Sequence, residues 1–357
     1  MDPTEDLRYR QSTQFRLWSY ARPSLAALRQ KTNGLAATHI ATRLQPAPEF
    51  LTPEEERRLL DFFTVELLRA AAYLELPTEI RASAAVHMRR FYVTNSVMTY
   101  SPTDLLKTCL FFGSKGEGFY ERLSRWVCVL IFLGALLWGM AGWSCGWWGL
   151  REGGKGKKEG IDADGRHRFA EKLPNTTAEE VLAGEFLLCQ GIRFCFDVRH
   201  PFRALEGVIL ELRRHFPEEV CPPNHHLPFR HISGKQWLKT KTPFQNTRIE
   251  KAHARARHIL KFSPLVTDAY FHYTPSQIMF AALSMADQEL AGRMLERTFG
   301  FETSTGGEGG DATMDGAHDE VRGKILRTIE SCREMLEAEP PERMDEFWGT
   351  VSFYSPL

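Results

Sequence analysis

The chain has 357 residues with 45 basic and 45 acidic side chains, a length that allows two domains and a net charge of zero that argues against nucleic-acid binding as its main function. Its seven cysteines include no C-x-x-C pair, so neither a zinc module nor a disulfide framework is indicated. The first residues, M-D-P-T-E-D, lack the apolar core of a secretory signal, which predicts an intracellular, reducing compartment.

Helix start signals and apolar repeats predict an all-α chain. Thr52-Pro53-Glu54-Glu55 is a capping box that opens one helix, and Thr78 is a candidate cap for the next. A second capping box begins at Thr177. The pattern contains no convincing strand, and the acidic, glycine-rich stretch from Gly306 to Gly316 is predicted to be a loop. Further helices are predicted over 201–216, 248–262, 287–299 and from Val321 to Leu336.

A short segment of the chain occurs twice. Y-S-P-T-D-L-L-K-T-C-L begins at residue 100, and Y-T-P-S-Q-I-M-F-A-A-L begins at residue 273. Each copy offers a hydroxyl N-cap, proline at the first helical position and a polar residue at the third that can reach back to the cap. The repeat therefore predicts that a similar helical module is built twice. The structural residues of the repeat are Tyr100, Ser101, Pro102 and Asp104, and then Tyr273, Thr274, Pro275 and Gln277.

Two stretches interrupt this order. Trp126 to Leu150 contains 25 residues without a charge and is followed by a Gly-, Lys- and Arg-rich stretch to Arg168. The segment 220–247 has no helical period and many helix breakers. Removing 126–168 and 220–247 leaves 102 positions between the two repeat copies, a suitable length for one five-helix module. Removing the two stretches also joins the helical apolar patterns on either side of each into one continuous amphipathic pattern.

We interpret both stretches as insertions and hypothesise that they are translated intervening sequence, as are the last residues, W-G-T-V-S-F-Y-S-P-L. Peptides joining Arg125 to Phe169 in the native protein support this hypothesis, and abundant peptides spanning Arg168–Phe169 contradict it. Residues 126–150 are long enough to cross a membrane. A crossing there would split the first module, so no membrane association is expected. Cys221, His225, His226 and His231 lack the ligand spacing of a metal site.

Four segments resemble the cyclin H family of cyclins. They are M-R-R-F-Y-V-T-N-S-V-M-T-Y-S-P (88–102), V-L-A-G-E-F-L-L-C-Q (181–190), H-P-F-R-A-L-E-G (200–207) and L-V-T-D-A-Y-F-H-Y-T-P-S-Q-I (265–278). The resemblance covers roughly residues 15–340 outside the insertions. It implies two tandem five-helix cyclin boxes with flanking helices. The expected domains are an N-terminal extension over 1–51, a first box over 52–196, a second box over 197–300, and a loop, helix and tail over 301–357.

The resemblance also implies a function. A cyclin H is a non-catalytic regulatory subunit that binds and activates a cyclin-dependent kinase, together with a RING-type assembly factor and the TFIIH core, in the nucleus. It acts in kinase activation and in phosphorylation of the RNA polymerase II C-terminal domain, and it needs no cofactor or metal. The kinase-contacting Lys and Glu of the first box match Lys115 in G-S-K-G-E-G-F and Glu185 in A-G-E-F-L-L.

Two other readings use the same fold. One is a different transcription cyclin, against which the signature from Phe91 to Tyr100 argues. The other is a TFIIB-like general transcription factor, which normally carries an N-terminal zinc ribbon and a basic face. No cysteine precedes Cys109 and the net charge is zero, so this reading is disfavoured.

Overall fold

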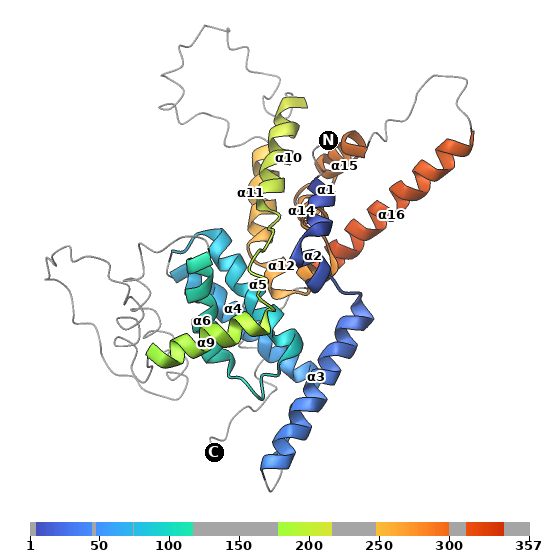
Figure 1. Cartoon of the computed structure of the whole chain (residues 1–357). Coiled ribbons are helices and arrows are strands. Elements are labelled where there is room, and N and C mark those ends of the chain that lie inside the picture. Colours follow the sequence, from blue (N-terminus) through green and yellow to red (C-terminus); the bar gives the residue numbers. More distant parts are fainter. Residues whose placement is uncertain are drawn as a thin grey trace, which may run out of the picture. The chain divides into compact units, whose positions relative to one another are not determined.

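The computed structural model describes residues 5–44, 48–73, 75–116, 178–215, 248–299 and 312–338. Every regular element in these ranges is an α-helix (Figure 1), which confirms the predicted all-α class. None of these helices is long and apolar enough to cross a membrane. The helices are α1 (Glu5–Gln11), α2 (Thr13–Trp18), α3 (Arg22–Arg43), α4 (Pro53–Tyr73), α5 (Thr78–Thr94), α6 (Pro102–Gly116), α9 (Ala178–Gly191), α10 (Phe202–His215), α11 (Arg248–Leu260), α12 (Ser263–Val266), α13 (Ala269–His272), α14 (Pro275–Ala286), α15 (Gln288–Phe299) and α16 (Ala312–Glu337).

The chain forms two compact units. The N-terminal unit comprises residues 22–198, and the C-terminal unit comprises residues 1–21 together with 199–357. Backbone hydrogen bonds hold the first residues in the C-terminal unit, because the Tyr20 N–H donates to the Phe271 carbonyl oxygen at 2.8 Å. The segment 1–51 is therefore shared between the units, with α1 and α2 in one and α3 in the other.

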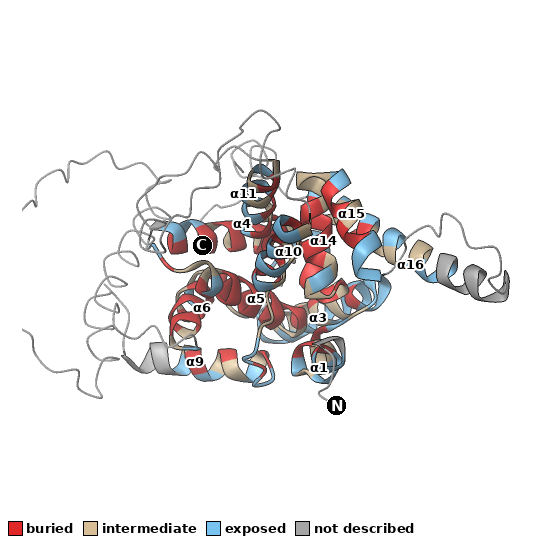
Figure 2. Ribbon diagram, turned by 90° about the horizontal axis from the view of Figure 1, so that it is seen from above, coloured by how far each residue is buried: buried red, intermediate tan, exposed pale blue. Residues whose placement is uncertain are grey.

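Helix α5 forms the core of the N-terminal unit. It contacts α3, α4, α6 and α9, and Figure 2 shows most of it coloured as buried. Its residues from Ala82 to Val93 are all buried, because a helix that meets neighbours on every side can leave no face to water. The charged group of Arg89 is accommodated by an ion pair, in which its Nη1 lies 2.8 Å from Asp61 Oδ1 on α4.

Helix α14 has the corresponding place in the C-terminal unit. It contacts α10, α11, α15 and α16, and its segment from Ile278 to Leu283 is buried. In the N-terminal unit, the repeat helix α6 packs on α4, α5 and α9. Each copy of the repeated sequence thus begins a helix that packs against several others.

Two of the predicted capping boxes form, at the starts of α14 and α4. Thr274 and Gln277 form a complete capping box at α14, since each side chain bonds the backbone of the other residue. At α4, the Thr52 N–H donates to Glu55 Oε2 at 2.7 Å, and the Glu55 N–H donates to Thr52 Oγ1 at 3.3 Å. Tyr273 is buried beside its helix and donates from its hydroxyl to Ser331 Oγ at 3.1 Å.

Three local predictions were wrong. Thr78 is the first residue of α5 and not its cap, which is Pro77 and makes no side-chain cap bond. Asp104 does not reach back to Ser101, and its carboxylate lies 3.8 Å from Lys107 instead. Helix α16 begins at Ala312, so the end of the predicted glycine-rich loop is helical.

Several predicted features lie outside the described residues. These are the Thr177 capping box, both insertions with the apolar stretch 126–150, the cysteine and histidines of 221–231, and the last residues from 339. Within the described residues, no group of His, Cys, Asp and Glu side chains is arranged to hold a metal ion.

Candidate functional site

The end of α6 and the middle of α9 bring together two residues that lie 70 positions apart. Lys115 Nζ is 3.1 Å from both carboxylate oxygens of Glu185. The Glu185 side chain is 9% exposed and that of Lys115 is 35% exposed. Lys115 lies in the last turn of α6, where the helix dipole favours a cation. Its Nζ also lies 5.7 Å from the centre of the Phe111 ring, close enough for a cation–π contact. The pair is therefore held in one geometry.

Two glycines allow α9 to approach its neighbours this closely. A Cβ atom at Gly191 would lie 2.2 Å from Cδ2 of Phe91 on α5. A Cβ atom at Gly184 would lie 2.6 Å from the hydroxyl oxygen of Thr108 on α6. Both distances are far below carbon contact distances of about 3.5–4.0 Å. The glycines on either side of Glu185 thus set the separation at which it meets Lys115.

Helix α9 ends in a turn with a strained backbone. The Phe194 N–H donates to the Cys189 carbonyl oxygen at 2.8 Å, and the Arg193 N–H donates to that of Gln190 at 2.9 Å. This is the Schellman pattern, in which glycine usually occupies the left-handed position. Here Arg193 and Phe194 have φ angles of 55° and 53°. A bulky residue in this region costs on the order of 1 kcal/mol or more, and such strain is concentrated at functional segments.

Two buried side chains of α5 hold the chain after this turn. His87 Nε2 donates to the Phe196 carbonyl oxygen at 3.2 Å. Arg90 Nη1 donates to the carbonyl oxygens of Cys195 at 3.0 Å and Asp197 at 3.4 Å. Burial, aided by the charge of Arg90, lowers the pKa of His87 to about 3, so this histidine is neutral. The backbone of 195–197 is fixed from inside the unit, with the Cys195 side chain buried and the Phe196 side chain exposed.

Three aromatic side chains are exposed on α9 and the turn that follows it. Phe186, next to Glu185 on α9, is 60% exposed, and Phe194 and Phe196 are 59% and 47% exposed. The Phe194 and Phe196 rings lie 6.2 Å apart, and the Phe196 ring lies 5.3 Å from that of Phe112 on α6. Phe112 is one turn before Lys115. We call Phe186, Phe194 and Phe196 the aromatic cluster. Large apolar side chains grouped at a surface mark a contact site.

Comparisons with known proteins identify the family. Residues 200–337 match a family model described as the cyclin C-terminal domain. The chain is 40% identical to a chain in the structure of the CAK complex from Chaetomium thermophilum bound to ATP-gamma-S, covering 98% of this chain and 85% of that one, with a TM-score of 0.66. The chain belongs to the cyclin H family. This confirms the resemblance inferred from the four sequence segments.

Two curated relatives are also cyclins. Cyclin CCL1 of Saccharomyces cerevisiae is 26% identical over 313 residues, which is 83% of this chain and 62% of that protein. Cyclin mcs2 of Schizosaccharomyces pombe is 27% identical over 289 residues, which is 77% of this chain and 68% of that protein. This cyclin thus spans about two thirds of the length of each.

The sequence of this cyclin indicated Lys115 and Glu185 but not the aromatic cluster. The pattern C-Q-G-I-R-F-C-F predicts that its phenylalanines are core residues. Their exposure depends on the turn after α9, which the pattern does not indicate. The available signal was the absence of glycine after the helix, which leaves Arg193 and Phe194 to adopt left-handed angles.

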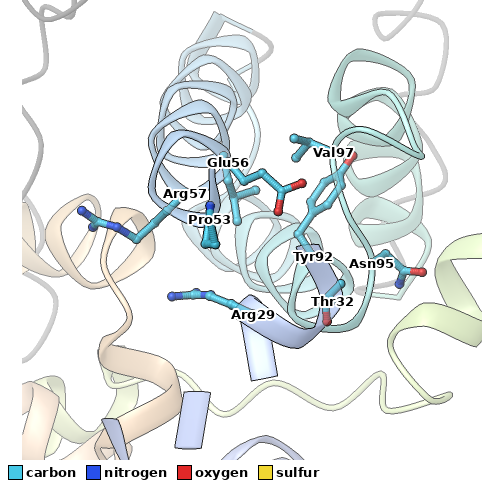
Figure 3. Close-up of a pocket in the computed structure, with 9 residues that line it drawn as sticks. Arg29, Thr32, Pro53, Glu56, Arg57, Tyr92, Asn95 and Val97 are labelled. Carbon is cyan, nitrogen blue, oxygen red and sulfur yellow. The ribbon is translucent and has the colours of Figure 1, made fainter. Parts of the chain in front are cut away.

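A pocket in the same unit has a structural explanation. It lies between α3, the start of α4 and the loop after α5 (Figure 3). Thr32, Tyr92 and Asn95 in its wall each donate to a backbone carbonyl oxygen, at 3.2, 2.9 and 2.9 Å. Glu56 accepts from the Ser96 hydroxyl. Thr32 thus joins α3 to α5, and the bonds of the other three side chains fix the end of α5 and the loop after it.

Proposed function

We propose that this chain binds and activates a cyclin-dependent kinase through the Lys115–Glu185 pair and the aromatic cluster beside it. The observation that carries the proposal is a nearly buried ion pair with exposed phenylalanines near it, one next to Glu185 on α9 and two at the strained turn after that helix. An apolar centre with a fixed polar group beside it is the arrangement of a protein interface. Lys115 and Glu185 are the residues that the family resemblance assigns to kinase contact.

The ion pair still has bonding capacity for a partner. An ammonium group has three N–H donors, and a carboxylate accepts about four hydrogen bonds. Within the described residues, the hydrogen bonds of both groups are those that they make with each other. A kinase backbone segment could therefore accept from Lys115 and donate to Glu185 without breaking the pair. Because the pair is already ordered, little side-chain entropy is lost on binding.

The aromatic cluster supplies the apolar part of the same surface. Burying an exposed phenylalanine stabilises a contact by roughly 1.5–3 kcal/mol. The α5 anchors His87 and Arg90 fix the backbone beneath the cluster, so the rings are presented without a loop having to fold on binding. The strain at Arg193 and Phe194 is then the cost of holding an aromatic side chain outward.

We infer that activation works by a population shift in the kinase. A cyclin that binds the active arrangement of the kinase C-helix more tightly than the inactive one raises the active population. That helix carries the Glu that must pair with the phosphate-binding Lys for fast phosphoryl transfer. The cyclin then contributes no catalytic group of its own.

The relatives support a more specific assignment. The C. thermophilum structure is of a CAK complex, and the residues that resemble cyclin H include both copies of the repeat. We therefore propose that the chain acts in the nucleus with a kinase and a RING-type assembly factor as part of TFIIH, and that residues 52–196 and 197–300 are its two cyclin boxes. Mass spectrometry of proteins that co-purify with the chain from nuclear extract tests this, and recovery of neither partner contradicts it.

The kinase contact is tested with Glu185→Ala. Each variant is co-expressed with the kinase, and phosphorylation of a polymerase C-terminal-domain peptide is measured beside the melting temperature of the free chain. We expect at least about a tenfold loss of activation, which corresponds to about 1.4 kcal/mol. The free chain should be nearly unchanged in stability, because Lys115 is exposed enough to be solvated once its partner is gone.

Two further variants make the result specific. Lys115→Ala should destabilise the free chain more than Glu185→Ala, because it leaves a nearly buried carboxylate without its cation. Glu320→Ala is the matched control, since it removes the acidic member of an exposed pair on α16 in which Lys324 Nζ lies 2.6 Å away. Normal activation by Glu185→Ala, or an equal loss with Glu320→Ala, refutes the assignment.

A further inference from the structure

Positive charge is concentrated on one part of the C-terminal unit. From Arg248 to Lys261, the chain has five basic residues and one acidic residue, although its overall charge is zero. Helix α11 occupies nearly all of this stretch and lies beside α10 (Figure 1). The apolar side of α11, which includes Ile249, Ala256 and Leu260, is buried. The charges are therefore displayed on its opposite side.

Ion pairs along the seam between the two helices account for some of this charge. Arg213 Nη2 lies 2.6 Å from Glu250 Oε1, and Arg257 Nη1 lies 3.2 Å from Glu206 Oε1. Glu206 Oε1 also lies 3.1 Å from His253 Nε2. Because the end of α10 meets the start of α11, these pairs show that the helices run antiparallel. The acidic side chains nearest the seam are thus already engaged.

Five cations remain outside these pairs. All five are exposed, and within the part of the chain that the structure describes none has an acidic partner. Four of them form what we call the basic face: Arg203, Arg214, Lys251 and Lys261. Lys251 and Arg255 lie four positions apart on one side of α11, a spacing at which like charges repel and destabilise a helix. Helix stability therefore gives no reason for the arrangement.

The antiparallel order places the four cations of the basic face at the corners of a small area, whereas Arg255 points away from α10, because His253 and Arg257, two positions to either side of it, face that helix. Arg214 and Lys251 lie at one end, where Arg213 meets Glu250, and Arg203 and Lys261 lie at the other end. Ten residues of helix rise by about 15 Å, and packed helices lie about 8–10 Å apart. The basic face therefore measures roughly 15 by 10 Å.

The α10 side of the face also carries an apolar side chain between two of the cations. Leu210 is 62% exposed and lies between Arg203 and Arg214 on the outer side of α10. Gly207, one turn earlier on this side, has open space around the position of a Cβ atom. Ala254 on α11 is also exposed. An aliphatic side chain between separated cations is complementary to a segment that carries acidic and aliphatic residues together.

We propose that the basic face binds an acidic polypeptide segment with aliphatic side chains. About five residues of extended chain span its length. Single-stranded nucleic acid is a poorer fit, because its binding sites combine cations with aromatic side chains on which bases stack. Among the described residues of α10 and α11, the exposed large apolar side chain is that of a leucine and not of an aromatic residue. A neutral chain also provides little long-range attraction for a polynucleotide.

A labelled peptide tests the proposal. The probe is a fluorescein-labelled peptide that repeats Glu-Glu-Leu-Glu over about twelve residues, long enough to exceed the roughly 15 Å face. Its binding to the full chain is measured by fluorescence anisotropy over a range of salt concentrations. The triple variant Arg214→Glu, Lys251→Glu and Lys261→Glu should lose at least tenfold in affinity. Leu210→Ala should weaken the Leu-containing peptide severalfold and leave an all-Glu peptide unaffected.

The control is a second triple variant that changes the net charge by the same amount at residues outside the basic face. Lys31, Arg43 and Arg297 are exposed basic residues of α3 and α15, and the triple variant of these to Glu should bind the peptide within about twofold of the unaltered chain. Circular dichroism checks that both triple variants are folded, and both should activate the kinase normally, which separates this proposal from the kinase contact. An equal loss in both triple variants, no peptide binding at physiological salt, or preferred binding of an oligothymidylate of similar length overturns the proposal.

Discussion

The close approach of α9 to α5 can be tested at Gly191. A Cβ atom there would lie 2.2 and 2.6 Å from two ring carbons of Phe91 and 3.2 Å from the Asn95 amide nitrogen. The ring cannot easily move aside, because it is fully buried and its centre lies 5.2 Å from that of Tyr92. Helix α9 would therefore have to shift outward by about 1 Å or more to restore a contact of roughly 3.5 Å.

The cost of Gly191→Ala follows from this shift. Adding a methyl group to a filled core costs about 1–3 kcal/mol, and the higher helix propensity of alanine offsets at most about 1 kcal/mol. We expect a net loss of about 1–2 kcal/mol and a fall in melting temperature of roughly 2–8 °C for a unit of this size. Because Glu185 lies on the same helix, activation of the kinase should fall as well.

The assay compares two glycines of the same unit. Gly34 lies in α3 with no atom within 4 Å of a Cβ position, so Gly34→Ala should raise stability by about 0.5–1 kcal/mol. Thermal and urea unfolding of both variants are followed by circular dichroism. The reasoning is refuted if Gly191→Ala is as stable as the unaltered chain, or if the two variants shift the transition in the same direction.

Two more predictions concern buried charge. His87 has a pKa of about 3 in the folded chain against an ordinary value of 6.5, so the unfolded chain binds an additional proton between these pH values and stability falls as the pH falls through this window. From pH 7 to pH 5, the free energy of unfolding of the unaltered chain should fall by about 2 kcal/mol more than that of His87→Gln. This variant keeps an N–H donor for the Phe196 carbonyl oxygen. If urea unfolding shows the same dependence of stability on pH for both proteins, the assignment is wrong. Asp61→Ala removes the carboxylate paired with the buried Arg89 and should cost about 3–5 kcal/mol. Glu54→Ala breaks an exposed pair on the same helix and should cost less than about 1 kcal/mol in the same unfolding experiment.

The sequence alone determined the features that depend on neighbours within a few residues. The capping boxes at Thr52 and Thr274 form as predicted, because donor and acceptor lie three positions apart in the first turn of the helix, although the same spacing at Ser101 and Asp104 does not close a box. The apolar period and the duplicated start signal gave the all-α class. The prediction failed at Thr78, where a proline one position earlier took the place of the cap.

Tertiary structure decided the rest, because these features join residues far apart in the chain. The sequence could suggest Lys115 and Glu185 only by resemblance; that their charged groups lie 3.1 Å apart depends on how closely α9 packs against its neighbours. Local pattern could not distinguish Phe91, which is fully buried, from Phe194, which is 59% exposed. Apolar composition drives burial in general, but which phenylalanine remains at the surface is set by the left-handed turn and by the α5 side chains that hold the backbone behind it.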